Sequence, residues 1–220
     1  MVRIDLGWVV DNLDLITSLL LEHLWLTGLA VGIGLLLSFG LALLVRASPT
    51  LYGPVLGVTG TLYSIPSLAL FALLTPVTGI GTTLTAEIAL VGYTLLILVR
   101  NIVEGLRGVP ADAVEAASGM GYTPTQRLLR VELPLAVPVI MAGVRIATVT
   151  TIGLVTVTAL IGLGGLGYLL VTIGINRGSF GATATLTGIV LAVALAVIAD
   201  VLLQMLQRWL TPWARRRATA

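Results

Sequence analysis

The sequence contains no cysteine, no lysine and a single histidine among its 220 residues. Without cysteine the chain can form no disulfide and offers no thiol nucleophile or thiolate metal ligand, and His23 cannot assemble a metal site alone. A Walker A phosphate-binding loop needs a lysine to reach the nucleotide phosphates, so the chain cannot hydrolyse ATP by that route. The sequence therefore predicts no catalytic residue, no metal ligand set and no cofactor bound by this chain.

Charged side chains are also scarce, at 10% of the residues, whereas 57% are hydrophobic and the mean hydropathy is +1.08. One water-soluble core cannot bury that much apolar surface. A helix needs about 20 mostly apolar residues to span the hydrocarbon of a bilayer. Four runs without a charged residue reach that length, at 24–45, 47–86, 146–176 and 178–199, and the two longest exceed one helix. The chain is therefore predicted to be an all-α integral membrane protein.

Proline and glycine divide these runs into five expected membrane spans. We place the spans at about 24–45, 51–75, 83–102, 138–160 and 182–205, with the second and third separated at Pro76–Gly81. Residues 1–23 are expected to form an interfacial segment outside the membrane, 24–205 the transmembrane domain and 206–220 a basic tail. The acidic N-terminus differs from the basic start of a secretory signal, so we expect it to be retained.

Arginine is the only strongly basic residue, and its distribution predicts the orientation. With the N-terminus outside, ten of the twelve arginines lie inside or at the inner edge, and only Arg3 and Arg177 lie outside. This bias fits the positive-inside rule. The polar loop 103–137 and the C-terminus are therefore expected to be cytoplasmic.

The polar loop reads as two short helices joined by a bend. Pro110 suits the first turn of one helix, which Gly119 and Gly121 can end. Thr123-Pro124 then reads as a cap that opens a second helix, which we expect Pro134 to end. Small side chains at Ala116 and Ala117 permit close approach of a partner, and the charged residues Glu115, Arg127 and Arg130 can form pairs around the contact.

The same loop carries a spaced pattern. It runs Glu115-Ala116-Ala117, three residues, Gly121, nine residues, then Val131-Glu132-Leu133-Pro134. This is similar to the EAA loop of bacterial ABC-importer permeases and departs from it only by Val131, where the family usually has isoleucine. The resemblance implies the five-helix type I (MetI-like) permease fold. It also implies that the helix pair docks in a groove of a separate cytoplasmic ATP-binding subunit, which uses ATP and Mg²⁺. The implied coupling residues are Glu115, Ala116, Ala117, Gly121, Leu133 and Pro134. The alternative is an ordinary helical hairpin between two spans.

Three further stretches, at 64–70, 79–81 and 131–145, resemble the osmoprotectant branch of this family, which imports glycine betaine, choline, carnitine or proline betaine. The resemblance implies a bacterial cell membrane, a second permease chain (homologous or identical) and an extracytoplasmic substrate-binding protein, with membrane lipid around the spans and no nucleic acid. Aromatic residues in the spans are scattered, so we expect the cation to be caged mainly by the binding protein. The alternatives are a methionine or amino-acid importer of the same type, an ion-driven secondary transporter, and a structural membrane anchor.

Two other patterns are ambiguous. Gly162, Gly164 and Gly167 match the dinucleotide pattern G-x-G-x-x-G, but they lie in an uncharged run rather than between a strand and a helix, so a tight turn or close packing is expected instead. Arg145 and Asp200 could lie level on antiparallel helices and form an intramembrane pair. We prefer the simpler interpretation, in which Arg145 alone reaches the inner interface. Glu87 receives no assigned role.

Overall fold

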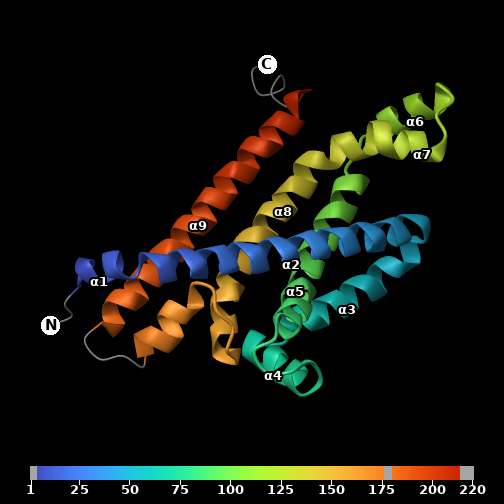
Figure 1. The fold of residues 1–220 in the computed structure, drawn as a ribbon. Coiled ribbons are helices and arrows are strands. Elements are labelled where there is room, and N and C mark those ends of the chain that lie inside the picture. Colours follow the sequence, from blue (N-terminus) through green and yellow to red (C-terminus); the bar gives the residue numbers. More distant parts are fainter. Residues whose placement is uncertain (1–3, 176–179, 214–220) are drawn as a thin grey trace.

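A computed structural model describes residues 4–175 and 180–213, and this part of the chain consists of helices joined by short turns (Figure 1). The helices in chain order are α1 Leu6–Asp11, α2 Leu13–Ala47, η1 Pro49–Leu51, α3 Tyr52–Ser64, α4 Ser67–Thr78, α5 Thr83–Arg107, α6 Ala111–Gly119, α7 Pro124–Arg127, η2 Leu128–Glu132, α8 Leu133–Val155, η3 Thr156–Ile161, η4 Leu169–Ile175 and α9 Gly181–Leu210. The predicted all-α class is confirmed. Arg3, Arg177, Arg215, Arg216 and Arg217, on which the orientation partly rests, lie outside the described residues.

Four helical units in the described chain are long and apolar enough to cross a membrane: α2, α5, the continuous helix 124–161, and α9. The predicted second span corresponds to α3 and α4, which are bent by 95° at their junction. The expectation of one helix over 51–75 is therefore wrong. Pro66 lacks an N–H and disfavours helical backbone in the preceding residue, so α3 ends at Ser64, whereas Pro76 lies inside the last turn of α4.

The first long helix, α2, begins at Leu13 rather than at residue 24. Its early turns are helical because Ile16 and Leu19 are buried against Leu166 and Leu169 of the chain that follows α8. The helix has 35 residues, and at 1.5 Å per residue it is about 52 Å long. That length exceeds the roughly 30 Å of bilayer hydrocarbon. Accordingly α2 crosses α5 and α8 obliquely (Figure 1).

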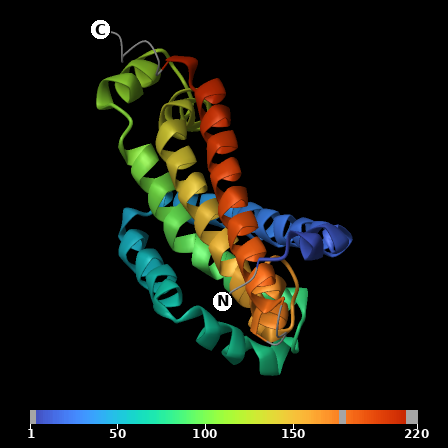
Figure 2. The same ribbon diagram turned by 90° about the vertical axis from the view of Figure 1, so that its left-hand side faces the viewer.

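The central helix is α5, which packs against α2, α3, α4 and α8. Figure 2 shows α5, α8 and α9 running side by side, with α4 crossing at the end opposite α6. Glycines allow the closest approaches: a Cβ on Gly34 of α2 would lie 1.9 Å from the hydroxyl of Thr94, and one on Gly143 of α8 would lie 2.4 Å from the Cβ of Asn101. Small residues at such crossings are typical of helix packing in membranes.

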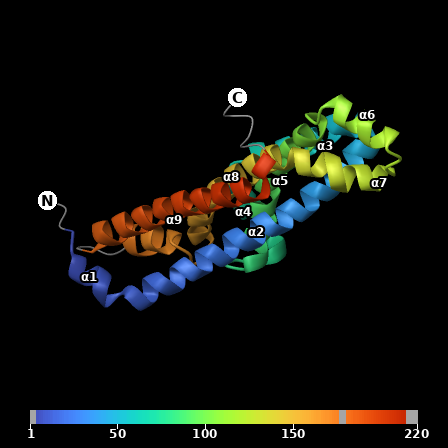
Figure 3. The same cartoon turned by 90° about the horizontal axis from the view of Figure 1, so that it is seen from above.

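The polar pair α6 and α7 lies together at one end of the molecule, and α1 lies at the other (Figure 3). A hydrophobic cluster next to α6 and α7 joins α2, α5 and α8, and it includes Ala42, Leu98, Ile102 and Ile140. The fold therefore presents the polar loop on a rigid base of packed helices.

Candidate functional site

Helix α6 ends in a C-cap that depends on Gly121. The Gly121 N–H donates to the carbonyl oxygen of Ser118 at 3.0 Å, and the Tyr122 N–H donates to that of Ala117 at 3.1 Å, which together form a Schellman motif. Gly121 has φ of +80°, whereas Gly119 is the last helical residue. A Cβ on Gly121 would meet no atom within 4 Å, so the backbone conformation, rather than space, requires glycine there.

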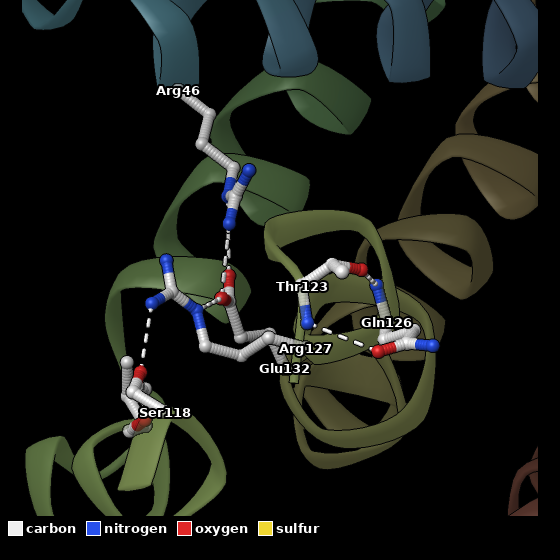
Figure 4. Close-up of polar contacts among 7 residues, drawn as sticks. Arg46, Ser118, Thr123, Gln126, Arg127 and Glu132 are labelled. Atoms are coloured by element: carbon white, nitrogen blue, oxygen red, sulfur yellow. Dashed lines mark hydrogen bonds and ion pairs between the residues drawn. The ribbon is translucent and has the colours of Figure 1, made fainter. Parts of the chain in front are cut away.

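Helix α7 begins as the sequence predicts. Thr123 and Gln126 form a capping box: the Thr123 N–H donates to the Gln126 side-chain oxygen at 3.0 Å, and the Gln126 N–H donates to the Thr123 hydroxyl at 3.3 Å (Figure 4). Each exchange satisfies an N–H that the first helical turn leaves unpaired.

The expectation that Pro134 ends this second helix is wrong. The chain passes from α7 through the π-helical turn η2, Leu128–Glu132, directly into α8, so residues 124–161 form one continuous helix. A proline in a helix loses one hydrogen bond and clashes with the carbonyl four residues earlier. The wider π turn immediately before Pro134 changes the hydrogen-bond register and accommodates the ring. The polar loop is thereby continuous with the span α8.

Glu132, in η2, connects three separate elements (Figure 4). Its Oε2 accepts a hydrogen bond from Nε of Arg46 at 3.1 Å, and its Oε1 accepts bonds from Nη2 of Arg46 and from Nε of Arg127, both at 2.9 Å. Arg127 in turn donates from Nη1 to the Ser118 hydroxyl on α6 at 3.0 Å. The Glu132 side chain is 8% exposed, and the side chains of Arg46 and Arg127 are about 30% exposed. One nearly buried carboxylate therefore ties α6 and α7 to the end of α2.

The ends of α3 and α5 are tied together beside this cluster. The Tyr52 hydroxyl donates to Glu104 at 2.7 Å, and the Arg107 guanidinium lies 4.0 Å from the centre of the Tyr52 ring. A cavity of about 200 Å³ is lined by residues of the Glu132 cluster, Arg46 and Glu132, and by Arg107 of the Tyr52 contact. Polar and cation–π contacts thus brace the base on which the loop stands.

The predicted coupling residues differ in their exposure and lie in two places, on α6 and at the start of α8. Glu115 and Ala116 are exposed on α6, Ala117 is buried at 1% exposure, and Leu133 and Pro134 are partly buried at the start of α8. Two large apolar side chains of the same loop are also exposed, Met120 at 67% and Leu129 at 58%.

The charged residues of this loop differ in their contacts. Arg127 is paired, but within the described residues neither Glu115 nor Arg130 forms an ion pair. Sequence reasoning missed Glu132 and Arg46 as the central pair. Two features of the sequence could have indicated this pair: an acidic residue directly before Leu133-Pro134, and an arginine directly after the first apolar run.

At the opposite end, the glycine-rich turn 162–167 is fixed to α2. The Glu22 carboxylate accepts the N–H groups of Gly164 and Gly165 at 3.2 and 3.0 Å. The His23 Nδ1 accepts the Leu166 N–H at 3.2 Å, so its Nε2 carries the proton and donates to the Ile152 carbonyl at 3.0 Å. The turn is therefore a packed structural element that follows a helix, and it lacks the strand that a dinucleotide site would need.

Arg145 of α8 and Asp200 of α9 form a two-point ion pair. Nε and Nη2 of Arg145 each lie 2.8 Å from one carboxylate oxygen of Asp200. The preferred interpretation, in which Arg145 reaches the interface alone, is therefore wrong. The two residues form a bidentate pair between two spans. Both side chains line an open groove of about 460 Å³ between α8 and α9.

Comparison with known proteins identifies relatives over nearly the whole chain. Residues 30–212 match the protein family described as the binding-protein-dependent transport system inner membrane component. The osmoprotectant import permease protein OsmW of Salmonella typhimurium is 40% identical over 93% of this chain and 96% of its own length. The choline transport system permease protein OpuBB of Bacillus subtilis is 34% identical over 89% and 88%. The inward-facing MetNI methionine ABC transporter superposes with a TM-score of 0.78 at 26% identity, over 91% of this chain and 98% of that chain.

Proposed function

Because this chain belongs to the family of binding-protein-dependent transport system inner membrane components, we propose that it is the permease through which an ATP-driven importer carries quaternary-ammonium osmoprotectants. The family consists of multi-pass, non-catalytic subunits of ABC transporters. The proposed substrates are glycine betaine, choline, carnitine and proline betaine. Their support is that relatives with 34–40% identity over most of the chain are named for osmoprotectant and choline transport.

The observation that carries the coupling role is the exposed face of α6 standing on the Glu132 cluster. Glu115 and Ala116 face outward from α6 while Arg127 and Glu132 hold α6 and α7 to α2. A separate ATP-binding subunit, which supplies the ATP and Mg²⁺ chemistry, docks on this face. Movement of that subunit passes through Glu132 to α2 and through the continuous helix 124–161 to the membrane domain.

The proposed coupling residues act in three ways. Glu115 and Ala116 contact the partner, since both are exposed and the small alanine permits close approach. Ala117 and Gly121 shape α6 from within, through burial and through the C-cap. Leu133 and Pro134 join the loop to α8. Exposed Met120 and Leu129 add apolar area to the docking face.

The proposed orientation places α6 and α7 in the cytoplasm. Arg46, Arg107, Arg127 and Arg130 all belong to this end of the molecule, as the positive-inside rule requires of a cytoplasmic face. The opposite end, with α1 and the turn 162–167, then faces the extracytoplasmic binding protein. A second permease chain completes the pathway, and the importer alternates between outward and inward access.

The test reconstitutes the permease with its ATP-binding subunit and binding protein in proteoliposomes. We expect uptake of labelled choline or glycine betaine to require ATP, to be competed by the other osmoprotectants but not by methionine, and to survive an ionophore. Competition by methionine alone favours the methionine importer. Uptake that persists without ATP and collapses with the ionophore favours an ion-driven transporter.

A pair of variants tests the docking face itself. Ala116→Trp is expected to abolish ATP-dependent uptake and to weaken binding of the ATP-binding subunit, because the indole blocks the close approach. Ala111→Trp is the matched control, since Ala111 is exposed on the same helix but lies about 140° around it from Ala116. Normal transport by Ala116→Trp contradicts the coupling role of this face.

A further inference from the structure

The junction of α3 and α4 places an interrupted helix inside the membrane domain. Helix α3 ends at Ser64, and Ile65 and Pro66 are extended before α4 begins at Ser67. The last carbonyl groups of a helix lack N–H donors from a following turn, and they form the negative end of the helix dipole. Carbonyls at the ends of broken helices are a recurrent means of holding cations in membrane transporters.

Two tyrosines meet at this junction. The rings of Tyr63 and Tyr93 are 5.9 Å apart between centroids and inclined by 74°, in an edge-to-face arrangement. The Tyr93 hydroxyl donates to the Ile65 carbonyl, which fixes that ring against the break. Tyr93 is 5% exposed, whereas Tyr63 is 39% exposed and open to approach. The aromatic residues, which are scattered in the sequence, therefore include one pair that is adjacent in space.

A groove of about 280 Å³ lies at the tyrosine pair. Its lining consists of Tyr63, Ser64, Ile65, Pro66, Ser67, Tyr93, Thr150 and Leu154. These residues supply two aromatic rings, backbone carbonyl groups and hydroxyl groups, and none of them carries a charged side chain. A lining of this kind attracts a cation through the ring quadrupoles and carbonyl dipoles, and offers an anion no basic partner.

A second groove on α8 adjoins this one. Thr150 lines both this groove and the one that holds Arg145 and Asp200. The Arg145 charge is neutralised by its bidentate pair with Asp200, so it does not oppose a cation at the tyrosines. A solute leaving the tyrosine groove therefore has a second hollow next to it.

We infer that the groove at the α3–α4 break is a transient binding site for the quaternary-ammonium group of the transported solute. The inference rests on the proposed function. A quaternary ammonium cannot donate hydrogen bonds, so ring faces and carbonyl dipoles are the contacts that stabilise it, while Ser64, Ser67 and Thr150 contact the polar remainder. Two rings bind it more weakly than a full aromatic cage does, which suits a site that must release its ligand onward.

The experiment measures choline uptake by the complete importer in proteoliposomes, with the loaded binding protein at saturating concentration. Tyr63 is varied in a graded series to Trp, Phe and Leu. We expect Tyr63→Leu to lower the maximal uptake rate about fivefold, as loss of one cation–π contact predicts, and Tyr63→Phe and Tyr63→Trp to stay near the wild-type rate. ATPase activity stimulated by the loaded binding protein should change less than twofold in all three, which also establishes that each variant is folded and assembled.

Three outcomes overturn the inference. Wild-type uptake by Tyr63→Leu shows that the ring makes no contact with the solute. An equal loss in Tyr63→Phe and Tyr63→Leu assigns the effect to the hydroxyl instead of the ring face. Loss of stimulated ATPase activity in parallel with uptake assigns Tyr63 to the packing of the complex. Absence of ATP-dependent uptake of choline, glycine betaine and carnitine by the wild type overturns the proposed function itself. This outcome is distinguished from failure of the inference because it appears in the unmodified protein.

Discussion

Arg46, at the last turn of α2, and Glu132, 86 residues later, hold each other through two hydrogen bonds of 2.9 and 3.1 Å. The same carboxylate also pairs with Arg127, whose guanidinium reaches α6 through Ser118. The first long helix is therefore connected to the proposed docking face through a continuous chain of polar contacts. Bidentate, charge-assisted hydrogen bonds restrict both the distance and the orientation of the groups that they join.

The first prediction concerns this pair. Arg46→Gln and Glu132→Gln should each destabilise the permease by about 2 kcal/mol, because each leaves a largely buried charged partner with fewer hydrogen bonds. The double variant should have a melting temperature no lower than that of the less stable single variant, since the free-energy changes of residues in one ion-pair network do not add. Thermal melting is followed by tryptophan fluorescence of the detergent-purified protein. Uptake per ATP hydrolysed should fall in all three variants.

Arg130→Gln is the matched control, because Arg130 is exposed in the same turn and has no ion pair in the described chain. It should leave the melting temperature unchanged. Additive effects of Arg46→Gln and Glu132→Gln would show that the two side chains are not coupled.

The second prediction concerns the C-cap of α6. Gly121→Ala should destabilise α6 by about 1 kcal/mol, because a Cβ disfavours the left-handed backbone at φ of +80° although the space around it is open. Binding of the ATP-binding subunit should weaken accordingly, by roughly fivefold if the strain acts entirely on docking. The affinity is measured by titrating that subunit onto immobilised permease.

Gly119→Ala provides the control within the same helix. Gly119 is helical and a Cβ there meets no atom within 4 Å, so the substitution should be neutral or stabilise the helix by up to about 1 kcal/mol. If both alanine variants bind alike, the C-cap does not determine docking.

The sequence predicts the elements best where chemistry is local. Charge-free runs of sufficient length reveal the spans, and Thr123-Pro124 reveals the start of α7, because a cap involves only neighbouring residues. Proline is a poorer guide to where a helix ends. Pro66 breaks a span that was expected to be continuous, whereas Pro134 lies in a continuous helix because a π turn precedes it. Both outcomes depend on what the surrounding helices can accommodate.

The site is less accessible to sequence reasoning because its contacts are long-range. Glu132 and Arg46 come from segments that the sequence treats separately, and only the crossing of α2 over α5 and α8 brings them together. Tyr63 and Tyr93 meet for the same kind of reason, through the packing of α3 on α5. Glu115 and Arg130 are exposed and form no ion pair with the described residues, so their charge pairs around a partner contact stay a prediction.

The third prediction concerns Arg145 and Asp200. Either Arg145→Asp or Asp200→Arg places two like charges within hydrogen-bonding distance between spans, and each should strongly lower transport and the amount of folded permease. The double exchange, Arg145→Asp with Asp200→Arg, should recover a substantial part of both. Uptake is normalised to permease in the membrane, determined by immunoblot. Failure of the double exchange to recover more than either single variant argues against a paired role.

The fourth prediction concerns the turn that Glu22 holds against α2. A Cβ on Gly164 would lie 1.9 Å from Oε2 of Glu22, so Gly164→Ala must expel the carboxylate and leave the N–H groups of Gly164 and Gly165 without it. Glu22→Ala removes the same two bonds without a clash. Each variant should cost about 1 to 3 kcal/mol, the penalty for buried donors that lose their acceptor.

The double variant decides between lost hydrogen bonds and simple damage. Once Glu22 is alanine, the space next to Gly164 is vacant, so adding Gly164→Ala should cost little more and the two effects should be far from additive. Asp14→Asn and Gly28→Ala are the controls on α2, since Asp14 is exposed and a Cβ on Gly28 meets nothing within 4 Å. Melting temperature and amide hydrogen exchange over 162–167 are the measurements. Additive losses would mean that the carboxylate does not hold this turn, and its contact with α2 would then depend on the His23–Leu166 hydrogen bond and on the packing of Leu166.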